Sequence, residues 1–184
     1  MSNLLFKTHM SFLRISGAVV LVALSSQLIG CASQSMAISR SANPAAKNVK
    51  RIALMPGGGV LAEAVGIQLM SLGFDIVDMS VATNTAARLN INEFEYAQPA
   101  NLKDLANKYG VDCVLIVKSV GGYDGKPNSA AARLLETRTG SLLAGVTWQN
   151  GKGGAQESPA DNLMRSDVST AAKKMAGGIA STLR

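Results

Sequence analysis

The first thirty residues of this chain have the organisation of a removable leader, which limits the folded part to the residues after Gly30. A polar, cationic start precedes an apolar stretch over residues 15–24, the order typical of a secretory signal peptide. That stretch has about ten residues, too few to cross a bilayer core of roughly 30 Å as a helix. Because Met10 to Gly30 would make a complete leader by itself, either Met1 or Met10 fits as the start. Cutting after Gly30 leaves 154 of the 184 residues, enough for one compact domain.

The leader ends in Leu28-Ile-Gly-Cys31, with a glycine directly before a cysteine. This tetrapeptide resembles the lipobox of bacterial lipoproteins, and the resemblance implies removal of residues 1–30 and attachment of diacylglyceryl and acyl chains such as palmitate to Cys31. The alternative is an ordinary buried N-terminal helix. Ala32 rather than aspartate follows the cysteine, which by similarity to enterobacterial sorting favours the outer over the inner membrane. We therefore expect a lipid-anchored envelope protein whose domain faces the periplasm.

The composition of the remaining chain argues against several classes of function. Two of the 18 Lys and Arg residues leave with the leader and all 12 acidic residues stay, so the net charge is about +4, scattered without a nucleic-acid patch. The single histidine also leaves, which removes Ser-His-Asp and Cys-His catalysis and zinc sites that need imidazole. Cys113 lies in an apolar run typical of a buried strand, where a lone thiol is a core residue. With no carboxylate cluster, the sequence predicts no enzyme, no cofactor, no metal site and no nucleic-acid partner.

Residues 32–50 are rich in Ser, Ala, Asn and Pro and have no apolar periodicity, which predicts a flexible tether between lipidated Cys31 and a domain over 51–184. Its 19 residues would span roughly 60 Å at full extension. Within the domain, apolar periodicity and Gly/Pro positions predict strand 51–55, helix 60–72, strand 74–78, helices 80–89 and 99–109, strand 112–120, hairpin strands 131–137 and 141–148, and helix 159–183. This β-α-β-α-α-β-β-β-α order predicts a single α/β (α+β) domain with a mixed sheet of about five strands flanked by helices.

A glycine-rich turn follows the first predicted strand. Gly57-Gly-Gly-Val-Leu-Ala62 satisfies G-x-G-x-x-A between a strand and a helix, and Asp78 stands 21 residues after Gly57. Dinucleotide sites use glycines to let the backbone approach the pyrophosphate and an acid to bind a ribose hydroxyl. Gly57, Gly59 and Asp78 are therefore candidate cofactor-binding residues of an alternative, Rossmann-like nucleotide-binding domain. Pro56 and the antiparallel second half of the predicted order favour a plain strand-to-helix turn instead.

Four segments of the domain stand in a telling order behind the lipobox: Lys50-Arg-Ile-Ala-Leu-Met-Pro56, Leu72-Gly-Phe-Asp-Ile-Val-Asp78, Leu105-Ala-Asn-Lys-Tyr-Gly-Val-Asp-Cys-Val-Leu-Ile-Val117 and Leu134-Leu-Glu-Thr-Arg-Thr-Gly-Ser-Leu-Leu143. This order resembles a superfamily of periplasmic lipoproteins that includes the curli-secretion channel lipoprotein and the lipoprotein activators of penicillin-binding proteins. The resemblance covers roughly residues 50–183. The chain lacks the long amphipathic hairpin segments of the curli channel and the long Pro/Gln-rich tether of the activators, so neither specific activity carries over.

The resemblance implies a non-catalytic envelope lipoprotein that binds other proteins in the assembly or stabilisation of an envelope or secretion machine, with a homo-oligomer as one form of the assembly. Activation of a peptidoglycan synthase stays open as an alternative. Three aromatic residues in expected connections are candidate partner-binding residues: Tyr123 in the glycine-rich loop 121–128, and Phe94 and Tyr96 between acids ahead of Pro99. The alternative for all three is packing onto their own domain.

Overall fold

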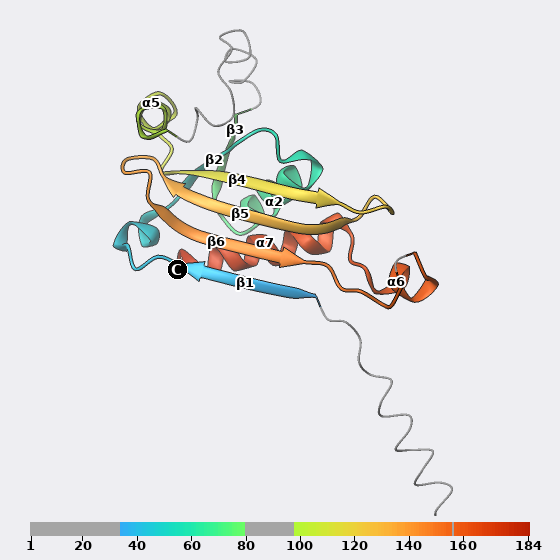
Figure 1. The fold of residues 1–184 in the computed structure, drawn as a ribbon. Helices are drawn as coiled ribbons and strands as arrows, with labels where there is room; N and C mark the ends of the chain where they lie inside the picture. The colour runs from blue at the N-terminus through green and yellow to red at the C-terminus, as the bar shows by residue number, and fades with distance from the viewer. Residues whose placement is uncertain (1–33, 80–97, 156) are drawn as a thin grey trace, which may run out of the picture. The chain divides into compact units, whose positions relative to one another are not determined.

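A mixed β-sheet organises the part of the chain that the computed structural model describes, residues 34–79, 98–155 and 157–184. Its strand order is β1-β6-β5-β4-β2-β3 (Figure 1). The strands are β1 (Ser35–Arg40), β2 (Arg51–Leu54), β3 (Asp75–Asp78), β4 (Cys113–Gly121), β5 (Pro127–Glu136) and β6 (Leu142–Gln149). The helices are η2 (Pro44–Asn48, a 3-10 helix), α2 (Gly59–Ser71), α5 (Pro99–Tyr109), α6 (Pro159–Met164) and α7 (Val168–Thr182). The predicted class, a mixed sheet flanked by helices, is confirmed, with six strands where about five were expected.

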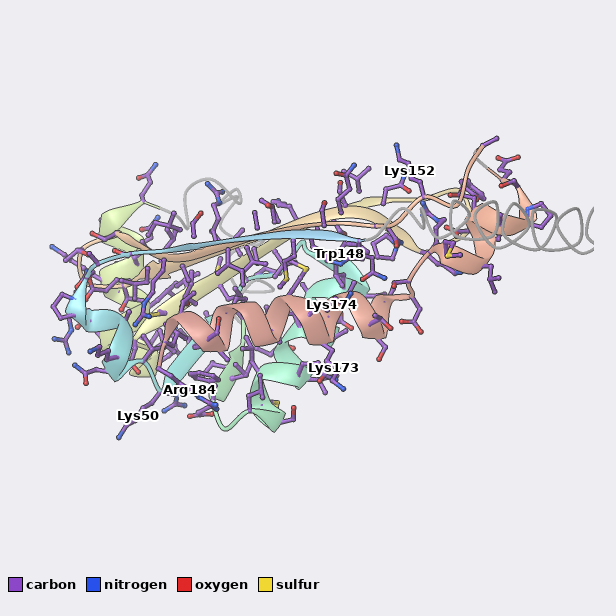
Figure 2. All side chains as sticks on the ribbon, turned by 90° about the horizontal axis from the view of Figure 1, so that it is seen from below. Lys50, Trp148, Lys152, Lys173, Lys174 and Arg184 are labelled. Atoms are coloured by element: carbon purple, nitrogen blue, oxygen red, sulfur yellow. The ribbon has the colours of Figure 1, made fainter. Side chains whose placement is uncertain are left out.

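The two halves of the sheet differ in direction, as the predicted order required. β2 pairs in parallel with β3 and with β4, while β4, β5, β6 and β1 form antiparallel pairs. Helices cover both faces of this sheet. α2 and α7 bury their apolar residues on one face, where Trp148 lies between the sheet and α7 (Figure 2). α5 packs Leu102 and Leu105 on the other face, against Ala53 and Val114 of β2 and β4.

β1 corrects the prediction that residues 32–50 form a flexible tether. It pairs with β6 over six residues, from Ser35 opposite Gln149 to Arg40 opposite Ala144. All six of its residues are exposed, and its two large apolar residues, Met36 and Ile38, make too short an alternation to predict a strand. Met36 and Ile38 nevertheless point to the face that α7 covers, because a Cβ placed on Gly178 of α7 would lie 3.3 Å from Ile38 Cδ1. η2 then continues the ordered chain to β2.

The predicted helix 159–183 is also wrong in one respect, because it is broken into α6 and α7. Arg165 has extended backbone angles, φ −78° and ψ 130°, and so ends α6. Asp167 then caps α7, its side chain accepting a hydrogen bond of 2.7 Å from the backbone N–H of Thr170. The loop predicted over 121–128 is shorter than expected, since β5 begins at Pro127. The predicted helix 80–89 lies outside the described residues.

The ordered state of β1 can be tested by placing a charge on each of its faces. We expect Ile38→Asp to lower the free energy of unfolding by about 1–2 kcal/mol, because it loses apolar burial against α7. Ser39→Asp, on the opposite face of the same strand, should leave the value within about 0.5 kcal/mol of wild type. Urea unfolding followed by circular dichroism measures both. A flexible tether would make the two substitutions equally silent.

Candidate functional site

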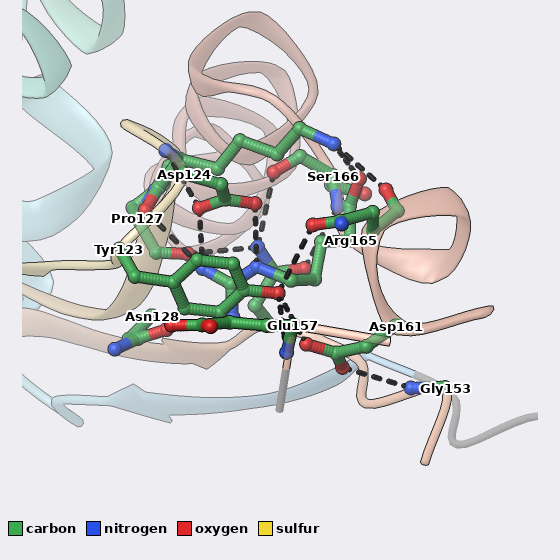
Figure 3. Close-up of polar contacts among 12 residues, drawn as sticks. Tyr123, Asp124, Pro127, Asn128, Gly153, Glu157, Asp161, Arg165 and Ser166 are labelled. Atoms are coloured by element: carbon green, nitrogen blue, oxygen red, sulfur yellow. Dashed lines mark hydrogen bonds and ion pairs between the residues drawn. The ribbon is translucent and has the colours of Figure 1, made fainter. Parts of the chain in front are cut away.

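Tyr123, predicted as a contact residue, lies in the turn between β4 and β5 at one end of the sheet. This turn, the loop after β6 and α6 surround a pocket of about 310 Å³. Its polar lining comes from all three segments and includes Asn128, Gln149, Lys152, Asp161 and Arg165. Polar side chains from segments far apart in the sequence therefore lie together here, and Figure 3 shows the contacts among them.

The Tyr123 hydroxyl joins the turn to α6. The hydroxyl donates to Asp161 Oδ2 at 2.7 Å, and Asn162 Oδ1 is a second acceptor within reach at 3.0 Å. The same hydroxyl oxygen accepts a hydrogen bond of 3.0 Å from Glu157 N. Asp161 Oδ1 also accepts from Gly153 N at 3.0 Å. These hydrogen bonds lower the pKa of the Asp161 carboxyl below its ordinary value, and the bond from Tyr123 has the largest effect. Tyr123 itself remains 39% exposed, so part of its ring faces solvent.

Asp124 and Arg165 form a buried ion pair beside this tyrosine. Arg165 donates from Nε to Asp124 Oδ2 at 2.8 Å and from Nη2 to Oδ1 at 3.1 Å, while the two side chains are only 5% and 12% exposed. The bidentate contact lowers the pKa of Asp124 and raises that of Arg165. The guanidinium also lies over the Tyr123 ring, 5.3 Å from its centroid. A Cβ on Gly122 would lie 2.7 Å from the backbone oxygen of Lys126 and 2.2 Å from Arg165 Nη2, so the turn needs a glycine there.

Two further side chains fasten the backbone around the pair. Lys126 Nζ donates to the carbonyl oxygens of Asn162 at 2.9 Å and Arg165 at 3.2 Å, at the C-terminal end of α6. Asn150 Nδ2 donates to Pro127 O at 2.7 Å and Ser166 O at 3.0 Å, and its Oδ1 accepts from Ser166 N at 2.8 Å. This network was not predicted from the sequence, because its members come from the β4–β5 turn, the loop after β6 and the α6 segment, and share no local motif.

The side chains of Tyr123, Asp124, Asp161 and Arg165 bind one another. We call this group of residues the platform. Among the described residues, no three His, Cys, Asp or Glu side chains are grouped so that they could hold a metal ion. No helix in the described ranges is long and apolar enough to span a bilayer. Cys113 is fully buried in β4, as predicted, and burial raises the pKa of its thiol to about 12. Cys31, Phe94 and Tyr96 lie outside the described residues, so their predicted roles stay predictions.

The glycine-rich turn lies at the carboxyl end of β2. Leu54 at the end of β2 pairs with Asp78 at the end of β3, so the structure brings the turn and Asp78 to the same edge. Gly57 and Gly59 have φ values of 90° and 61°, which favour glycine. A Cβ on Gly58 would lie 2.4 Å from Ala62 Cβ and 2.6 Å from Val117 O. Backbone conformation and helix–sheet packing therefore account for all three glycines, and nucleotide binding by Gly57, Gly59 and Asp78 stays a prediction.

Comparison with known proteins gives similarity of fold. No protein-family model matches the chain, and no curated protein matches it in sequence. Among solved structures, the chain is similar to a PelC dodecamer from Paraburkholderia phytofirmans, with a TM-score of 0.44 and 14% identity over 82% of this chain and 97% of that chain. It is also similar to lipoprotein GNA1162 from Neisseria meningitidis, with a TM-score of 0.46 and 20% identity over 73% of this chain and 99% of that one. Similarity at this level assigns no function to the chain.

The acid stability of the fold should depend on the platform. Because the pKa values of Asp124 and Asp161 are lower in the folded than in the unfolded chain, their contribution is present above about pH 4 and is lost as the pH falls further. We expect the midpoint of thermal unfolding to drop between pH 5 and pH 3, and to drop less in Asp161→Asn. Circular dichroism melts at both pH values measure this. An identical pH dependence in the variant would contradict the role of Asp161.

The two kinds of glycine in the turn should respond differently to substitution. Gly58→Ala should cost about 3 kcal/mol of folding stability or more, because its Cβ would lie 2.4 Å from Ala62 Cβ and 2.6 Å from the backbone oxygen of Val117. Gly59→Ala, with nothing within 4 Å of its Cβ, should cost only the roughly 1–2 kcal/mol of a left-handed alanine. Urea unfolding of both variants measures the difference. Equal costs would show that close packing does not fix the residue at position 58.

Proposed function

We propose that this chain is a non-catalytic lipoprotein, anchored in the bacterial outer membrane through acylated Cys31, that binds partner proteins of an envelope or secretion machine close to that membrane. The observation that carries the proposal is the start of β1 at Ser35, four residues after the predicted lipid site. A domain with so short a connection serves partners that lie at the membrane surface. This disfavours the alternative of a synthase activator, which reaches its enzyme across the periplasm on a long tether.

The contacts of Gln34 support the short connection. Its side-chain amide donates to Ser166 Oγ and accepts from Lys174 Nζ, so the chain is held against α7 already at this residue. Gln34 is the third residue after Cys31, and these three steps along the chain span at most about 11 Å. Lipid on Cys31 would therefore hold the domain directly at the bilayer.

Binding of proteins is supported by the open edge of the sheet. β1 is an outermost strand of the sheet that the described residues form, and it has a row of backbone N–H and C=O groups facing away from β6. Such an edge accepts an added strand from a partner chain or from a second copy. The half-exposed ring of Tyr123, held in place by the platform, is a second contact candidate. A non-catalytic role agrees with a platform whose charged groups bind one another.

Cys31→Ser tests the anchor. We expect the wild-type protein in the outer-membrane fraction of a Gram-negative host, with the mass of attached acyl chains, because lipid on Cys31 is its only proposed membrane anchor. The variant should move to the soluble periplasmic fraction. Density-gradient separation and intact-mass spectrometry measure both properties. Wild-type levels of the variant in the outer membrane would contradict the anchor.

The same membranes test the binding part of the proposal. After mild solubilisation, the acylated protein should copurify in a stable particle with envelope or secretion proteins, or as a multiple of itself. Cys31→Ser, purified from the periplasm in parallel, is the control for capture after lysis. Recovery of the acylated protein alone, at monomer size, would contradict a stable subunit.

A further inference from the structure

One row of paired residues crosses four strands at the end of the sheet where β1 begins. Ser35 pairs with Gln149, Gln149 with Ser129, and Ser129 with Val120. The β4–β5 turn, the loop after β6 and α6 all lie beyond this row (Figure 1). The start of β1 and α6 therefore share one end of the domain.

Gln34 ties the start of β1 to the segment that follows α6. Its side chain binds Ser166, which stands two residues after Met164, the last residue of α6. Cys31 is three residues from Gln34, so the two Cα atoms lie within about 11 Å of each other, and acyl chains on Cys31 would enter the bilayer close to this end. Of the surfaces that the structure describes, this end must be the one nearest the membrane.

The same end carries the most exposed large apolar side chain among the described residues. Leu163 of α6 is 81% exposed, and Met164 beside it is also exposed. A second exposed apolar group, formed by Val60, Ile67 and Met70 on α2, has no such link to the lipid site. The charges around α6 are mixed, because exposed Lys152, which Figure 2 shows at this end, is accompanied by exposed Glu157. The surface is thus suited to contact through apolar side chains rather than through net charge.

α6 is held firmly enough to present these side chains. A six-residue helix is unstable alone, and here Tyr123 binds Asp161 while Lys126 binds the carbonyl oxygens of Asn162 and Arg165. Leu163 and Met164 project from the segment that these bonds fix. We infer that Leu163 and Met164 of α6 enter the interfacial region of the phospholipid bilayer, beside the acyl chains on Cys31, and so fix the orientation of the domain. This inference rests on the lipid anchor of the proposed function.

Probes at the two ends of the sheet test this contact in the full acylated protein. Leu163→Cys places a thiol on α6, and Leu142→Cys is the matched control, an exposed leucine at the start of β6. The strand length puts Leu142 about 24 Å from Gln149, beyond reach of the interface. Acylated Cys31 and buried Cys113 do not react, so a thiol-reactive NBD fluorophore labels one site in each variant.

The labelled proteins are reconstituted in vesicles of phosphatidylethanolamine and phosphatidylglycerol. Because interfacial side chains lie roughly 5–10 Å deep, we expect nitroxide-labelled lipids to quench the probe at 163 about fivefold or more strongly than that at 142, with the reverse order for aqueous iodide. Equal iodide quenching at both sites, in protein that floats with the vesicles and carries acyl chains, would overturn the membrane contact while the anchor stands. If position 163 is shielded from iodide but is not quenched by the nitroxide lipids, the membrane contact is wrong and α6 instead contacts a second copy of the protein. Protein without acyl chains that does not float would contradict the anchor itself.

Discussion

The pairing of β1 with β6 is the interaction that orders the start of the domain. It holds six residues in antiparallel register and brings Met36 and Ile38 opposite Trp148 and Val146. These pairs extend the sheet over the face where α7 packs, and Gly178 lets the helix approach closely enough to touch Ile38. The same pairing fixes the point at which the chain leaves the domain toward Cys31. The predicted tether over residues 32–50, with a span of roughly 60 Å, is thereby replaced by a connection of three residue steps from Cys31 to Gln34.

The buried Asp124–Arg165 pair has a different role. Removing two charges from water is costly, and the cost is offset only when their hydrogen bonds are complete. Here the carboxylate accepts from Nε and Nη2 of the guanidinium and from Lys126 N. The guanidinium also donates to Lys126 O and lies over the Tyr123 ring. The pair therefore joins the β4–β5 turn to Arg165, the residue with extended backbone that separates α6 from α7.

Local patterns predicted the elements whose reasons are local. β4 and α7 have continuous or periodic apolar residues, and Gly110 ends α5 in a left-handed conformation as its position suggested. β1 was missed because an exposed edge strand needs no apolar run. The break at Arg165 was missed because the residue that binds its side chain there, Asp124, lies 41 residues earlier. The same holds for the candidate site. Tyr123 was predicted because it is an aromatic residue in a glycine-rich loop. Asp161 and Asn150 were not predicted, because their partners lie in segments far from them in the sequence.

The two edges of the sheet are not equivalent as binding surfaces. β3 is four residues long and has an aspartate at each end, and short, charged edges resist the addition of another strand. β1 is six residues long, contains no proline or lysine, and carries its one charge at Arg40, the end farther from Cys31. Strand addition is therefore favoured at β1. If α6 contacts the bilayer, β1 starts at the membrane and runs away from it, so an added strand would lie beside the anchor and extend into the periplasm. The anchor and the edge would then act together, because the lipid limits the partners to those that reach the membrane surface and the backbone of β1 provides the contact.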